Sequence, residues 1–99
     1  MESRAIKNKY NKLMGDLVRE HRLKMGLSQA QLAEQLGYDT LQFVSNVERG
    51  TAKLPLSTLG KLIELLGISQ KRIIDIQMNA FNELLLSEIE TGKRQLKKV

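Results

Sequence analysis

Five glycines divide the sequence into short segments, and their spacing restricts the fold more than any other feature. The segments that end at Gly26, Gly37, Gly50, Gly67 and Gly92 carry apolar residues every three or four positions. This period is typical of amphipathic helices, and a glycine just past a helix end can adopt the left-handed conformation that satisfies the last carbonyls. The pattern predicts an all-α chain of short helices, each closed by a glycine.

The apolar periodicity predicts five helices. In chain order they are expected over about residues 11–25, 28–36, 41–49, 55 or 57 to 66, and 70–90. Ser28 and Gln31 form the capping-box pattern S-x-x-Q at the start of the second helix. Asp39 or Thr40 is expected to cap the third helix, with Asp39 and Gln42 as a second possible box. Pro55 suits the first turn of the fourth helix, where its missing amide costs nothing.

The side chains expected in the core are aliphatic. In the first helix, the expected buried side carries Leu13, Met14, Leu17, Val18 and Met25. Gly60 lies inside the fourth predicted helix, where glycine costs up to ~1 kcal/mol relative to alanine. We interpret Gly60 as a position of close approach between two helices.

Length and composition indicate one small domain. The chain has 99 residues, of which 41% are hydrophobic, and this is enough for a single core. It has no cysteine, which excludes disulfides and Cys-ligated zinc. No apolar run approaches the ~18–20 residues of a membrane span, and the charged N-terminus lacks the apolar core of a signal peptide. We therefore expect a cytoplasmic protein with no membrane partner.

The charge is basic and unevenly distributed. The net charge is +5, with seven Lys/Arg against three Asp/Glu in residues 1–27, three against four in 28–68, and six against four in 69–99. A basic balance favours a polyanionic partner. We divide the chain into a basic N-terminal arm (1–12), a central domain (13–69), and a C-terminal helix with a basic tail (70–99).

The sequence contains no recognisable catalytic constellation. His21 is the only histidine, and no ligand-like spacing surrounds it. A nucleophile elbow, a phosphate-binding loop and a pair of catalytic carboxylates are all absent from the sequence. We expect no enzyme activity, no metal site and no cofactor.

Two short predicted helices joined by a glycine-containing turn make up the pattern of a helix-turn-helix. They span residues 28–36 and 41–49. In such a unit the second helix fits the major groove of B-DNA, which is ~12 Å wide, while the first helix crosses the backbone. The amide groups at the N-terminus of that first helix can bind a phosphate.

The stretch from Leu17 to Ser69 resembles the Cro and lambda-repressor type of helix-turn-helix, also called the xenobiotic-response-element family. The resemblance rests on Arg22, the run Leu27-Ser28-Gln29, Leu32-Ala33, the closing Glu48-Arg49-Gly50, Pro55 and the Leu66-Gly67-Ile68 corner. It implies a five-helix, lambda-repressor-like domain, here with an extended C-terminal helix. It also implies that residues 41–49 form the recognition helix.

The resemblance assigns roles to individual residues. The base-reading positions are Leu41, Gln42, Ser45 and Asn46. Gln42 and Asn46 are the best readers, because a side-chain amide can bond to both N6 and N7 of adenine. The phosphate-binding positions are Gln29, Thr51 and Lys53. Arg22 and Glu48 match an internal ion pair that links the first helix to the third.

One feature departs from the family pattern. The distance from Gly37 to Gly50 is thirteen residues, where twelve is commoner, with Tyr38 or Asp39 as the extra residue. The extra residue leaves the alignment of Leu41 and Gln42 with the family's recognition helix open by one position. The alignment of Asn46 is set by its distance of two residues from Glu48. The alternative for the polar residues of this helix is an ordinary solvated surface.

A long apolar stripe follows the helix-turn-helix. It includes Ile74, Met78, Phe81 and Leu85. Exposed apolar surface costs roughly 25 cal/mol per Å². The stripe either folds back on its own domain or forms a dimer interface. We favour the dimer, because a two-fold pair buries the stripe and supplies a second recognition helix.

These observations predict a dimeric, sequence-specific regulator of transcription that binds double-stranded DNA at a pseudo-palindromic operator. A repressor of phage, plasmid or toxin–antitoxin type is favoured. The alternative is a protein-interaction module, such as an antitoxin or adaptor whose C-terminal helix binds a toxin or another partner protein.

Overall fold

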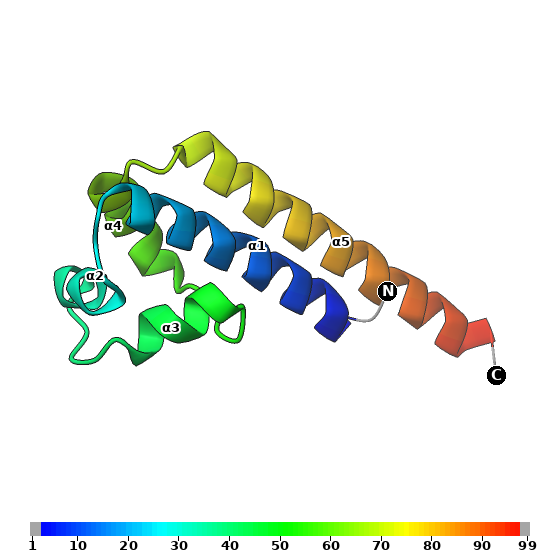
Figure 1. Cartoon of the computed structure of the whole chain (residues 1–99). Helices are drawn as coiled ribbons and strands as arrows, with labels where there is room; N and C mark the ends of the chain where they lie inside the picture. The colour runs from blue at the N-terminus through cyan, green and yellow to red at the C-terminus, as the bar shows by residue number, and fades with distance from the viewer. Residues whose placement is uncertain (1–2, 98–99) are drawn as a thin grey trace.

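The computed structural model describes residues 3–97 and contains five helices and no strand within that range. The helices are α1 (Ser3–Lys24), α2 (Gln29–Leu36), α3 (Gln42–Arg49), α4 (Leu56–Leu66) and α5 (Gln70–Lys97). The three short helices gather around one end of α1, and α5 runs back along α1 on the side opposite α3 (Figure 1). The expected all-α, five-helix architecture with a long C-terminal helix is confirmed.

The core lies where α1, α2, α3 and α4 meet, and the start of α5 closes it. Leu32 of α2 and Leu62 of α4 are completely buried at its centre. The remaining core side chains are Met14, Leu17, Val18, Ala33, Leu36, Val44, Val47, Leu54, Leu66, Ile68 and Ile73. Leu13 and Met25 were expected on the buried side of the first helix, but they are 44% and 55% exposed. Leu13 lies within α1, whereas Met25 follows the last residue of that helix, Lys24.

Four of the five punctuating glycines close an element as predicted. Gly26, Gly37, Gly50 and Gly67 have φ angles between 68° and 89°, the left-handed region that a side chain disfavours. The prediction was wrong for Gly92, because α5 continues through it to Lys97. One glycine costs a helix only about 1 kcal/mol relative to alanine. The surrounding turn is held by the Thr91 hydroxyl, which donates to the Ser87 carbonyl, and by the ion pair of Lys93 with Glu90.

The first helix begins eight residues earlier than expected, at Ser3 instead of Asn11. Residues 3–12, which the sequence indicated as a basic arm, are helical because α5 provides a surface for them. Ile6 and Tyr10 are 2% and 9% exposed. The Glu83 carboxylate of α5 accepts hydrogen bonds from Tyr10 Oη at 2.8 Å and Lys9 Nζ at 3.0 Å.

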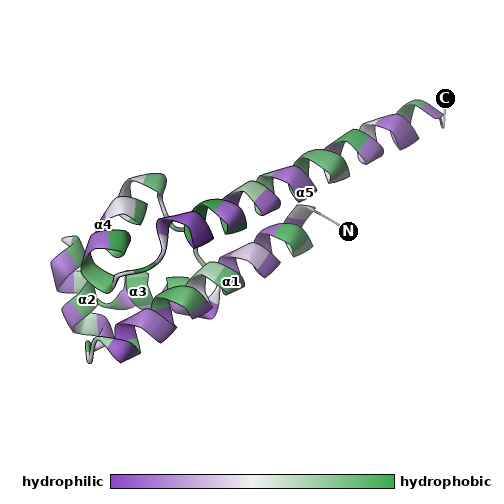
Figure 2. Cartoon of the chain, turned by 90° about the horizontal axis from the view of Figure 1, so that it is seen from above, coloured by the Kyte–Doolittle hydropathy of each residue, from purple (hydrophilic) through white to green (hydrophobic). Residues whose placement is uncertain are grey.

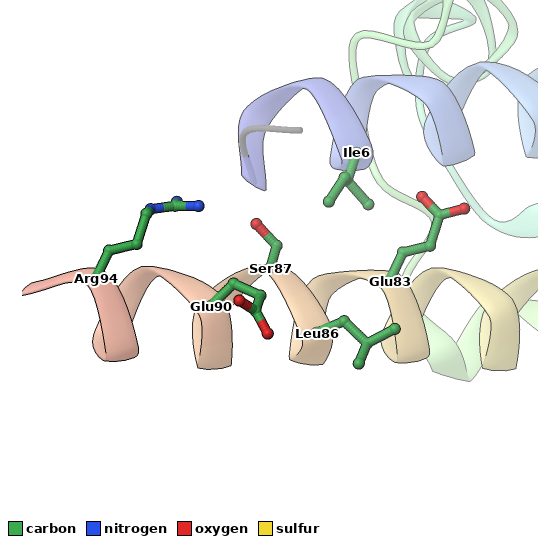
Figure 3. A pocket seen from close by; sticks show the side chains of 6 residues that line it. All are labelled: Ile6, Glu83, Leu86, Ser87, Glu90 and Arg94. Carbon is green, nitrogen blue, oxygen red and sulfur yellow. The ribbon is translucent and has the colours of Figure 1, made fainter. Parts of the chain in front are cut away.

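The C-terminal part of α5 extends beyond the start of α1 (Figure 2). At this end Ile6 points toward α5, and a groove of about 310 Å³ opens beside it (Figure 3). The groove is lined by Ile6, Glu83, Leu86, Ser87, Glu90 and Arg94. Ser3 of α1 also donates a hydrogen bond to Glu88. In residues 3–97 we find no helix with the length and apolar character that crossing a membrane requires.

Candidate nucleic-acid interface

The start of α2 is fixed by a reciprocal cap. The Ser28 hydroxyl accepts from the Gln31 backbone N–H at 3.0 Å, and the Gln31 side chain accepts from the Ser28 N–H at 2.8 Å. This is the capping box that the sequence predicted. The N–H groups of Gln29 and Ala30 have no acceptor inside the helix, because the first turn of any helix leaves them free. The start of α2 therefore offers two amide donors to an anion.

The turn from α2 to α3 is closed by backbone bonds and an aromatic stack. After the left-handed Gly37, the N–H of Tyr38 donates to the carbonyl of Ala33 at 2.9 Å. The rings of Tyr38 and Phe43 then stack, with centroids 4.2 Å apart and planes 16° apart. This stack ties the long turn to the first turn of α3.

The longer turn changes how α3 begins. Leu41 occupies the N-cap position without a side-chain cap, and Gln42 is the first helical residue. The expected cap at Asp39 or Thr40 and the predicted box of Asp39 with Gln42 were both wrong, because Leu41 is the N-cap residue. Instead, the Thr40 hydroxyl accepts a long 3.4 Å bond from the Gln42 N–H. Gln42 and Asn46 are thus one helical turn apart on the same face.

The inner side of α3 packs on α1 at Gly15, a position that was not predicted from the sequence. Val44 and Val47 are buried against the core. A Cβ atom at Gly15 of α1 would overlap the Val47 carbonyl oxygen and lie 3.1 Å from the Glu48 Cα. Gly15 is therefore the position where two helix backbones meet. The close approach expected at Gly60 was wrong, because nothing lies within 4 Å of a Cβ placed there.

A buried ion pair joins α1 to the end of α3. The Arg22 guanidinium donates to both carboxylate oxygens of Glu48, at 2.6 and 2.9 Å, and to the Leu27 carbonyl at 2.8 Å. Arg22 and Glu48 are 7% and 4% exposed. The hydrogen bonds to Glu48 raise the pKa of Arg22 above its ordinary value. This arrangement fixes the orientation of α3 and leaves neither residue available to DNA.

The Gln29 side chain joins the same network. Its amide nitrogen donates to a Glu48 carboxylate oxygen at 3.1 Å. The residue is half-buried, and its backbone N–H lies at the start of α2. A phosphate contact at Gln29, which the resemblance implies, stays a prediction.

The outward face of α3 is polar. Gln42 is exposed, and Ser45 and Asn46 are half-exposed. The Gln42 amide nitrogen donates to the Asn46 side-chain oxygen at 2.9 Å. Leu41, just before the helix, is 43% exposed.

The structure adds Arg49 to this face, because its guanidinium donates to the same Asn46 oxygen. Arg49 was not predicted on this face, although a residue seven positions after Gln42 lies on the same side of a helix. The four side chains of Gln42, Ser45, Asn46 and Arg49 form what we call the α3 outer face. Figure 1 shows α3 on the side of α1 away from α5. Within the α3 outer face, Gln42 and Arg49 are exposed and Ser45 and Asn46 are half-exposed.

The segment that follows α3 holds the two remaining predicted phosphate contacts. The Thr51 hydroxyl donates to the Asn46 carbonyl at 3.1 Å and closes the end of the helix. Leu54 is 4% exposed and anchors the segment in the core. Lys53 is exposed between them, at the edge of a hollow of about 330 Å³ bounded by α1, this segment and α5.

The four residues predicted to mediate dimerisation lie on one exposed side of α5. Ile74, Met78, Phe81 and Leu85 are 49%, 60%, 59% and 48% exposed. A neighbouring side of α5 packs on α1, through residues that include Glu83. Phe81 lies at the boundary, because it also lines the hollow between α5, α1 and the segment that carries Lys53. The long apolar stripe thus divides into a part that folds back on its own domain and a part that does not.

Comparison with known proteins agrees with this architecture. A family model described as helix-turn-helix matches residues 18–69, slightly more than half of the chain. Among solved structures, the crystal structure of the clp gene regulator ClgR from Corynebacterium glutamicum is similar, with a TM-score of 0.57 and 21% identity over 88% of each chain. No curated protein matches the sequence. The chain belongs to the helix-turn-helix family of DNA-binding regulators, of the xenobiotic-response-element and lambda-repressor type.

Proposed function

We propose that this protein is a repressor that binds a pseudo-palindromic operator as a dimer, with α3 in the major groove. The observation that carries the proposal is the α3 outer face. Its four polar side chains project from a helix whose opposite side is locked to α1 by Gly15 and by the Arg22–Glu48 pair. Base reading in a groove requires a rigid helix with polar side chains on one face, whose ends can adjust to the base edges.

The α3 outer face supplies the chemistry for direct readout. The side-chain amides of Asn46 and Gln42 can each donate an N–H to N7 of adenine and accept from its N6 amino group through the carbonyl oxygen. Arg49 can donate two bonds to O6 and N7 of guanine. The hydrogen bonds among these three side chains hold them together in free protein and exchange for base contacts on binding.

The groups that bind phosphate surround this face. They comprise the free amides at the start of α2, where Gln29 lies, and the segment that carries Thr51 and Lys53. Such contacts fix the position of the protein on the duplex and provide most of the affinity at low salt. Specificity then depends on the α3 outer face.

A dimer would present two copies of α3 to half-sites ~34–36 Å apart, one turn of DNA. Occupation of such a site excludes other proteins from the same DNA, which is the physical basis of repression. A small regulator of phage, plasmid or toxin–antitoxin type fits this description, with no catalytic step and with action in the cytoplasm.

Selection of bound sequences from a random duplex pool tests the proposal and defines the operator. With that operator, Asn46→Ala is expected to lose ~1–3 kcal/mol of discrimination at one base pair per half-site. Asn79→Ala, the same change on an exposed position of α5, is the matched control. Equal discrimination by wild type and Asn46→Ala would refute base reading by α3.

The phosphate contacts are tested by the salt dependence of affinity. Lys53→Ala is expected to weaken binding to all duplexes alike and to reduce the slope of log K against log salt by about one unit per site. Lys93→Ala removes the same charge near the far end of α5 and serves as the control. An effect of Lys53→Ala on one operator alone would contradict the assignment.

A second candidate function is favoured by the exposed apolar side of α5. In that case the surface binds another protein, such as a toxin, and DNA binding is secondary or lost. Gel shifts at several salt concentrations separate the two functions, because only the first predicts specific retardation of DNA by the purified chain.

A further inference from the structure

The exposed apolar side of α5 has the spacing of a helix-pairing seam. We call Ile74, Met78, Phe81 and Leu85 the outer stripe; its residues follow one another at intervals of four, three and four. These intervals reproduce positions d, a, d and a of a heptad repeat. Each of the four side chains is between 48% and 60% exposed, so a continuous seam lies open on a helix of 28 residues.

The chain itself leaves each side chain of the outer stripe about half exposed. The side of α5 that meets α1 carries Ile73, Gln77, Ala80 and Leu84, which lie roughly a third of a turn around the helix from the stripe. Phe81 lies at the boundary between the two sides, because it also lines the hollow between α5 and α1 and is still 59% exposed. Figure 3 shows Glu83 and Ser87 on the same α1-facing side further along. A helix that presents a second seam at such an angle can hold α1 and a further helix at once. A heptad seam is complementary to another copy of itself, so a second copy of α5 fits it.

Charges at the two ends of the seam determine the direction of pairing. The seam continues at both ends of the outer stripe. Lys71 lies seven residues before Met78, and Glu88 lies seven residues after Phe81. In a parallel pair, Lys71 would face Lys71 of the second copy, and Glu88 would face Glu88. In an antiparallel pair with its two-fold axis between residues 79 and 80, Lys71 faces Glu88 at both ends. Like charges opposite one another destabilise a helix pair, and opposite charges stabilise it.

We infer that two copies of this chain associate through an antiparallel pair of α5 helices, in the register that places Ile74 opposite Leu85 and Met78 opposite Phe81 of the second copy. The inference rests on the proposed dimeric function and gives it a surface, a direction and a register. Lys71 and Glu88 at present contact Asp75 and Ser3 of their own chain. Both residues lie on the surface, so these local contacts are weak and can give way to the pairing between copies.

The absence of cysteine from the sequence makes a direct test available. Single variants Ile74→Cys and Leu85→Cys are purified, mixed and oxidised under mild conditions. A disulfide needs Cα atoms about 4.4–6.8 Å apart, so it reports which positions face each other. The antiparallel register predicts that the mixture forms the Ile74→Cys/Leu85→Cys dimer and that each variant alone forms little. Glu90→Cys, on another side of α5, gives the background from random collisions.

A charge exchange tests the direction independently. Lys71→Glu and Glu88→Lys are each expected to raise the dimer Kd by about three- to thirtyfold, because each puts like charges at both ends of the seam. The double variant restores opposite charges and is expected to return Kd to near the wild-type value. Sedimentation measures Kd, and circular dichroism confirms that each variant keeps its helix content.

Efficient disulfide formation by Ile74→Cys alone, together with no Ile74→Cys/Leu85→Cys dimer in the mixture, would show parallel pairing and overturn the inference. A wild-type chain that stays monomeric at all concentrations, or a double charge variant weaker than either single variant, would also overturn it. The operator-discrimination assay of Asn46→Ala is read separately. Failure of the disulfide test with discrimination intact therefore rejects the pairing and leaves the proposed DNA readout standing.

Discussion

Replacement of Gly15 by alanine has two opposing effects on the free energy of unfolding, and the size of each can be estimated. In an isolated helix the change stabilises by about 1 kcal/mol, because glycine is a poor helix former. In this fold the added Cβ would overlap the Val47 carbonyl oxygen and lie 3.1 Å from both the Glu48 Cα and the Glu48 carbonyl oxygen. All three atoms belong to backbone, which cannot move aside as a flexible side chain can.

The steric effect should therefore dominate. Relief of the overlap requires α1 and α3 to separate by roughly 1 Å, and overpacking of this kind typically costs ~1–3 kcal/mol. The separation would also stretch the Arg22–Glu48 hydrogen bonds, which now measure 2.6 and 2.9 Å. We expect Gly15→Ala to lower the free energy of unfolding by ~1–3 kcal/mol and Tm by about 4–8 °C per kcal/mol.

Gly60→Ala is the matched control. Gly60 lies within α4, and nothing comes within 4 Å of a Cβ placed there. The same substitution at Gly60 should thus raise the free energy of unfolding by up to about 1 kcal/mol. Urea titrations followed by circular dichroism measure both variants. Stabilisation by Gly15→Ala, or equal effects at the two glycines, would refute the close approach of α1 and α3.

Two further predictions concern ionised groups. Arg22→Met is expected to cost ~3–5 kcal/mol in urea unfolding, because it leaves the buried Glu48 carboxylate without its counter-charge. The double variant Arg22→Met/Glu48→Leu should recover most of this loss, and a double variant as unstable as the single one would contradict the explanation. Hydrogen bonds from Tyr10 and Lys9 lower the pKa of Glu83 below its ordinary value of 4.5. Ionised Glu83 therefore stabilises the fold above that pH, and the contribution is lost as the pH falls through the lower folded pKa. The Tm difference between wild type and Glu83→Gln should be present at pH 7 and should shrink as the pH falls below 4.5. A difference that does not change with pH would show that the charge is irrelevant.

The features that the sequence predicted well depend on residues close together in the chain. The Ser28–Gln31 capping box involves two residues three positions apart, and the closure at Gly37 and Gly50 depends on the local backbone conformation. The polar positions Gln42 and Asn46 are likewise related by a single helical turn. The separation of four residues already determines that they share a face.

The features that the sequence did not predict depend on distant partners. The start of α1 at Ser3 requires Glu83 and its neighbours on α5, more than 70 residues away. Gly15 looks like a weakness in a helix until the backbone of α3 is placed against it. Gly92 seemed to end a helix, yet α5 continues to Lys97, with the Thr91–Ser87 contact just before Gly92 and the Glu90–Lys93 ion pair across it.

Side-chain partners at the interface were also only partly predictable. The resemblance implied the pairing of Arg22 with Glu48, but the participation of Gln29 in the same network emerges only from the geometry. Arg49 was visible as the last residue before Gly50, and its contact with Asn46 places it on the α3 outer face.

The central claim is that the α3 outer face contacts bases, and NMR of the side-chain amides tests it most directly. The NH₂ resonances of Gln42 and Asn46 are followed as the free protein is titrated with its selected operator and with a scrambled duplex of equal length. We predict large shifts of both resonances with the operator, smaller shifts with the scrambled duplex, and little change at Asn79 on α5. Unchanged Gln42 and Asn46 resonances at saturation with the operator would contradict the account.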